Sequence, residues 1–108
     1  MFYKQEFEDC MDTFDEVLTK LRDRKYNIST EQEVKIEVVK EEIKRVMEDR
    51  SISAKELEDL YFQQYLKLRN IFDTIGNDTY LESKFIFLMG SINMLFTLEI
   101  LGRKRNET

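Results

Sequence analysis

The chain has 108 residues with no Pro, no His and only three Gly, and it is 42% hydrophobic and 36% charged. This composition is typical of one folded domain and excludes collagen-like, low-complexity and disordered chains. The absence of His excludes histidine-based zinc sites and Ser-His or Cys-His nucleophile pairs.

The net charge of −5 has the wrong sign for a protein that binds a phosphate backbone, so we expect no nucleic-acid partner. Cys10 is the only cysteine and cannot form an intramolecular disulfide, and the first residues lack the pattern of a signal peptide. Phe85 to Leu101 is apolar enough to mimic a short membrane span, but its polar residues, Glu99 among them, favour a buried helix. We therefore expect a cytoplasmic protein with no membrane partner.

Apolar residues recur at helical spacing in four segments, which predicts helices ending near residue 24 and spanning about 31–49, 54–75 and 80–101. The first stripe is Tyr3, Phe7, Cys10, Phe14, Val17 and Leu21; the second is Ile36, Val39, Ile43, Val46 and Met47. The third stripe is Leu57, Tyr61, Tyr65, Leu68, Phe72 and Ile75; the fourth is Leu81, Phe85, Leu88, Ile92 and Leu95.

The breaks between these segments carry helix-capping patterns. Capping boxes are predicted at Thr30-x-x-Glu33, Ser53-x-x-Glu56 and Thr79-x-x-Glu82. Gly76 is placed to end the third helix in a left-handed conformation. Short connections between long helices predict an all-α, antiparallel up-down four-helix bundle over residues 1–102, followed by a polar tail at 103–108.

The first helix carries an acidic surface opposite its apolar stripe. Residues 1–19 contain six acidic residues and one basic residue, whereas the rest of the chain contains 16 of each sign. Glu8, Asp12, Asp15 and Glu16 form a continuous negative face in this interpretation. We expect this face to bind another protein with a basic surface, although such charges are also common on plain solvated helices.

The last helix has more apolar circumference than three neighbours can cover. Phe87, Met94, Leu98 and Leu101 form a second stripe, about 120° or more from the first around the helix. An exposed stripe of this size is typical of a protein interface, which predicts a homodimer through Phe87, Gly90, Met94, Leu98 and Leu101. The alternative is that the first three helices wrap the fourth completely.

Paired carboxylates are the only candidates for catalysis. Lys55-Glu-Leu-Glu-Asp-Leu-Tyr-Phe resembles the second half of the motif of the MazG-type all-α nucleotide pyrophosphohydrolases, which implies Glu56 and Asp59 as magnesium ligands. Glu41 and Glu42 match the first half, but Arg45 stands where that family has a third glutamate. Glu37, Glu41 and Asp59 are also predicted to face solvent.

These observations predict a non-catalytic protein–protein interaction module, such as a regulator, adaptor or inhibitor, that requires no cofactor and no metal. A magnesium-dependent nucleotide pyrophosphohydrolase is one alternative. Another is an immunity-type protein, because the small helical immunity proteins that neutralise bacteriocins are similar to the predicted bundle in size and architecture.

Overall fold

The computed structural model describes residues 2–23, 29–74 and 79–107, and this part of the chain forms four α-helices and no strand. They are α1 (Lys4–Arg22), α2 (Thr30–Glu48), α3 (Ala54–Asp73) and α4 (Thr79–Asn106). The prediction of an all-α helical bundle is therefore confirmed.

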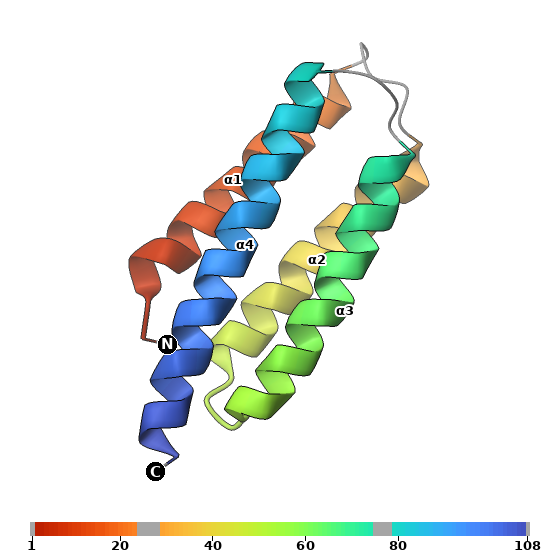
Figure 1. Cartoon of the computed structure of the whole chain (residues 1–108). Coiled ribbons are helices and arrows are strands. Elements are labelled where there is room, and N and C mark those ends of the chain that lie inside the picture. The colour runs from red at the N-terminus through yellow and green to blue at the C-terminus, as the bar shows by residue number, and fades with distance from the viewer. Residues whose placement is uncertain (1, 24–28, 75–78, 108) are drawn as a thin grey trace.

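The helices pack around a single elongated core. α1 packs on α2 and α4, and α3 packs on α2 and α4, so that the bundle measures 49 × 22 × 19 Å. α1 begins and α4 ends at the same end of the bundle, beside the turn that joins α2 to α3 (Figure 1). Phe14, Phe85 and Phe96 are the largest fully buried side chains.

The α2 stripe is buried as predicted, and so is the α1 stripe from Cys10 to Leu21, whereas Tyr3 and Phe7 are only half-buried. The buried face of α3 is rotated from the predicted one. Leu57 and Leu68 are buried, whereas Tyr61, Tyr65 and Phe72 are only half-buried. Gln64 and Ile71 are buried in their place. Tyr61 lies at the edge facing α4, where its ring centroid is 5.3 Å from that of Phe96. Ile75 lies outside the described residues.

The helix caps agree with the predicted breaks but differ in register. Ser29, not Thr30, is the N-cap of α2, and it forms a capping box with Gln32. Ser53 caps α3 by accepting the backbone N–H of Glu56, which is one half of the predicted capping box, and the Glu56 carboxylate accepts from the Ser53 hydroxyl. Residues 75–78, which include Gly76 and the residue before Thr79, lie outside the described residues.

The predicted polar tail is wrong for residues 103–106, because α4 continues to Asn106. Gly102 and Arg103 are buried. The ring of Phe2 packs so closely on Gly102 that a Cβ there would lie 2.9 Å from the Phe2 Cδ2 atom. Arg103, which the sequence interpretation placed in the tail, therefore belongs to the bundle.

Candidate protein-binding surface

The second stripe of α4 is uncovered within one chain. The exposed fractions of Phe87, Met94 and Leu101 are 64%, 59% and 46%, and Leu98 is half-buried. Ile86, which sequence reasoning did not include, is 61% exposed and adjoins the stripe. The three helices α1, α2 and α3 therefore do not enclose this side of α4.

The packing of α4 explains which side is left open. α4 has its main contacts with α1 and α3, and these neighbours cover the first stripe, which is buried throughout. The buried residues of α4 are Leu81, Phe85, Leu88, Ile92, Leu95, Phe96, Glu99, Gly102 and Arg103. Because α4 is apolar on nearly all sides, its side facing away from α1 and α3 exposes large apolar residues to solvent. By length and composition alone, α4 would also qualify as a membrane span.

A groove runs along one side of the second stripe, between α1 and α4. Its volume is about 750 Å³. The groove is lined by Glu6, Asp9, Asp12 and Thr13 of α1 and by Ile86, Phe87, Gly90, Ser91 and Met94 of α4. We refer to it as the α1–α4 groove. It joins one member of the predicted acidic face, Asp12, to three members of the predicted dimer interface.

A second groove, of about 500 Å³, runs along the other side of the stripe, between α3 and α4. Tyr61 and Tyr65 line it from α3, opposite Met94 and Leu98. The Tyr61 hydroxyl accepts a 2.9 Å hydrogen bond from the Asn93 side chain. This groove carries no charged lining residue, so the two sides of the stripe differ in charge.

Gly90 lies at the point where both grooves meet. A Cβ built at this position would have no heavy atom within 4 Å. Internal packing therefore does not require glycine here. Glycine in an exposed helix interior also lowers the stability of the helix by about 1 kcal/mol relative to alanine. Close approach by a second molecule is a physical reason for the residue.

The predicted acidic face of α1 is exposed, but two of its four carboxylates are paired within the chain. Asp15 forms an ion pair with Lys40 of α2, in which Asp15 Oδ1 lies 2.6 Å from Lys40 Nζ. Glu16 pairs with Lys84 of α4, and this hydrogen bond raises the pKa of the lysine. Glu8 and Asp12 form no ion pair with another described residue.

The uncompensated negative charge is therefore concentrated in the first half of α1. Glu6 and Asp9, which the sequence interpretation did not select, join Asp12 along the α1–α4 groove. Their spacing of three residues is a signal that the sequence does contain, because residues three apart share a helix face.

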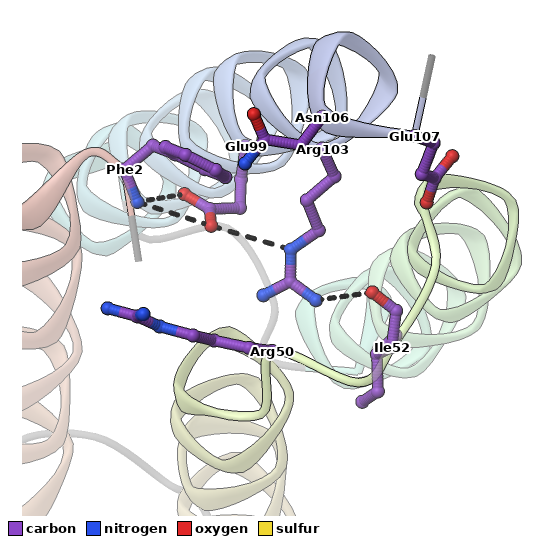
Figure 2. Close-up of a pocket in the computed structure, with 7 residues that line it drawn as sticks. All are labelled: Phe2, Arg50, Ile52, Glu99, Arg103, Asn106 and Glu107. Carbon is purple, nitrogen blue, oxygen red and sulfur yellow. Dashed lines mark hydrogen bonds and ion pairs between the residues drawn. The ribbon is translucent and has the colours of Figure 1, made fainter.

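At one end of the bundle, a pocket of about 370 Å³ is built around a buried ion pair that sequence reasoning missed (Figure 2). Arg103 Nε lies 3.4 Å from Glu99 Oε1, and both side chains are buried. The backbone N–H of Phe2 donates to Glu99 Oε2 at 3.1 Å. The guanidinium of Arg103 donates to the carbonyl oxygens of Val46, Met47, Asp49 and Ile52. These contacts give the polar atoms of Glu99 and Arg103 a structural role, because they join separate parts of the bundle.

The carboxylates considered as metal ligands are dispersed. Glu56 accepts a hydrogen bond from the Ser53 hydroxyl at the start of α3, and Asp59 is exposed. Glu37 pairs with Arg22 at 3.2 Å. Among the described residues, no group of three or more acidic or cysteine side chains is arranged to hold a metal ion. The arrangement thus gives no geometric support to the metal site that the pyrophosphohydrolase resemblance implies.

No protein-family model, curated protein or solved structure matches the chain.

Proposed function

We propose that this protein is a non-catalytic protein–protein interaction module that forms a homodimer through the second stripe of α4. The observation that carries the proposal is the exposure of Phe87, Met94 and Leu101 on a helix whose opposite side is fully buried. Association would remove these side chains from water, at about 25 cal/mol for each Å² of apolar surface. Gly90 would allow the two α4 backbones to approach closely.

The same proposal includes an antiparallel up-down order of the four helices. Gln32, near the start of α2, donates a hydrogen bond to Thr74 at the end of α3. Lys84, near the start of α4, pairs with Glu16 in the second half of α1. Contacts between the start of one helix and the end of its neighbour support antiparallel neighbours.

We also propose a second partner, another protein with a basic surface that meets the acidic residues of α1. Of the four residues of the predicted acidic face, Glu8 and Asp12 are retained in this proposal. Glu6 and Asp9 extend the acidic surface towards the start of α1. Asp15 and Glu16 contribute less, because Lys40 and Lys84 already compensate their charge. We place this activity in the cytoplasm, without nucleic acid, membrane or cofactor.

The dimer is tested by a double substitution, Phe87→Glu with Met94→Glu, which puts two charges on the second stripe. The matched control is Phe62→Glu with Leu66→Glu, which changes the charge equally at two exposed positions of α3 that line neither groove. Light scattering should give twice the 13.1 kDa mass of one chain for the wild type and the control, and a folded monomer for the α4 variant. An α4 variant that remains a dimer would refute the interface.

The non-catalytic part of the proposal has its own test. Magnesium-dependent release of pyrophosphate from nucleoside triphosphates, lost in Glu56→Gln or Asp59→Asn, would establish the enzyme alternative. The interaction module predicts no turnover with or without magnesium.

A further inference from the structure

The α1–α4 groove has an apolar floor and one acidic wall. Glu6, Asp9 and Asp12 are three residues apart, so they form a wall about 9 Å long at 1.5 Å per residue. Phe87 and Met94, seven residues apart on α4, give a floor about 10.5 Å long. The wall and the floor therefore run beside each other over about two helical turns.

These dimensions suit an α-helix as the occupant. A helix that presents apolar side chains at positions i, i+3 or i+4, and i+7 spans the same length. The open space beside Gly90 would receive the middle side chain. β-strand addition of an extended peptide requires an exposed sheet edge, and both sides of this groove are helices with internally bonded backbones.

The charge of the wall sets the chemistry of that helix. Asp9 accepts a 2.9 Å hydrogen bond from the neutral side chain of Gln5. None of Glu6, Asp9 and Asp12 forms an ion pair with another described residue. Three uncompensated carboxylates beside an apolar floor are complementary to a helix that carries Lys or Arg along one edge of its apolar face.

The geometry points to one occupant: an amphipathic helix of another protein binds in the α1–α4 groove, with its apolar residues on Phe87 and Met94 and its basic residues against Glu6, Asp9 and Asp12. This inference rests on the proposed function and identifies the basic partner by its shape and chemistry. Because Phe87, Gly90 and Met94 also belong to the proposed dimer interface, binding of this helix displaces the second copy.

The experiment uses the full chain and a fluorescent synthetic peptide of about 18 residues, a length at which an isolated helix is populated. The peptide has leucines at helical spacing and lysines along one edge, and a matched peptide has glutamate at each lysine position. Binding is measured by anisotropy at low salt for the wild type and two variants. One variant is Asp9→Asn with Asp12→Asn; the control is Glu41→Gln with Glu48→Gln, which removes the same charge from exposed positions of α2.

The lysine peptide should bind the wild type, and the Asp9/Asp12 variant should bind it about fivefold more weakly. The Glu41/Glu48 control should change its affinity by less than about twofold. Salt should reduce the difference between the variants, because exposed charges are screened. Equal weakening in both variants, or equal binding of the glutamate peptide, would overturn the inference.

Light scattering separates this inference from the proposed dimer. Saturation with the lysine peptide should convert the dimer to a complex of one chain with one peptide, and an unchanged dimer carrying bound peptide would overturn shared use of the groove. The wild type could instead be monomeric without peptide, while the Asp9/Asp12 variant still binds the peptide more weakly. This result would refute the dimer and support the groove as the docking site.

Discussion

Arg103 lies one helical turn after Glu99 on α4, and the two side chains form an ion pair in which both partners are buried. The arginine also donates to backbone carbonyl oxygens at the end of α2, Val46 and Met47 among them. The last carbonyls of a helix have no intrahelical partner, so Arg103 caps α2 from another helix. The Glu99 carboxylate in turn accepts the backbone N–H of Phe2. One residue pair therefore ties the start of α1, the end of α2 and the end of α4 together.

The first prediction is that Arg103→Met lowers the free energy of unfolding by about 3–5 kcal/mol, because it leaves the Glu99 charge buried without a partner. Adding Glu99→Gln should recover part of this loss, since the amide is neutral and still accepts from Phe2. Denaturant unfolding of the two single variants and the double variant measures both effects. A loss below about 1 kcal/mol for Arg103→Met would contradict the buried pair.

A second prediction concerns Gln64, which is buried at the centre of α3. Its Oε1 atom has no hydrogen-bond partner in the described part of the chain. An unsatisfied buried carbonyl costs about 1–3 kcal/mol, so Gln64→Met, which conserves length and volume, should raise the free energy of unfolding by about 1 kcal/mol. Gln64→Glu should lower it, because a charge would be buried instead. Equal stability of the wild type and the methionine variant would indicate that Oε1 is satisfied in solution.

The third prediction concerns the Cys10 thiol. Burial raises its pKa from the ordinary 9.0 to about 12. Between pH 9 and pH 12, the thiol of the unfolded chain loses its proton, whereas the thiol of the folded chain keeps it. The stability contributed by the protonated thiol is therefore complete below pH 9 and declines as the pH rises towards 12. Relative to Cys10→Ala, the wild type should lose about 1.4 kcal/mol per pH unit in this window.

Thiol labelling gives an independent measure of the same burial. At pH 8 an aromatic disulfide reagent should react with Cys10 only when the chain is unfolded by denaturant. Rapid reaction of the native protein would contradict the packed position of this residue in α1.

The sequence predicted most features that depend on one helix at a time, although it placed Tyr61 and Tyr65 of α3 in the core, where Gln64 is buried instead. The spacing of Cys10, Phe14, Val17 and Leu21 is sufficient to locate the buried face of α1, because helical geometry alone relates these positions. The position of the second stripe around α4 was predictable for the same reason, whereas its exposure depends on how α1 and α3 pack against α4. The cap of α2 was displaced by one residue because Ser29 with Gln32 and Thr30 with Glu33 both fit the capping pattern.

Features that depend on two helices were missed. The sequence interpretation placed Arg103 in a polar tail, because its role depends on carbonyls of α2 that lie more than 50 residues away. Pairing of Asp15 with Lys40 and of Glu16 with Lys84 likewise requires the neighbouring helices to be in place. No periodicity within one segment encodes these contacts.

The last prediction is that substitutions at Gly90 have opposite effects on the folding of one chain and on association. In the monomeric Phe87→Glu, Met94→Glu background, Gly90→Ala should raise the free energy of unfolding by about 0.5–1 kcal/mol, because helix propensity improves and the new Cβ meets no neighbour. In the wild-type background the same methyl group holds the two helices apart, so the dimer should dissociate at higher concentration. Gly90→Leu should prevent dimer formation, because its side chain fills the space where both grooves meet. Thermal unfolding and sedimentation equilibrium measure the two effects separately, and a dimer that tolerates leucine at this position would place the interface elsewhere.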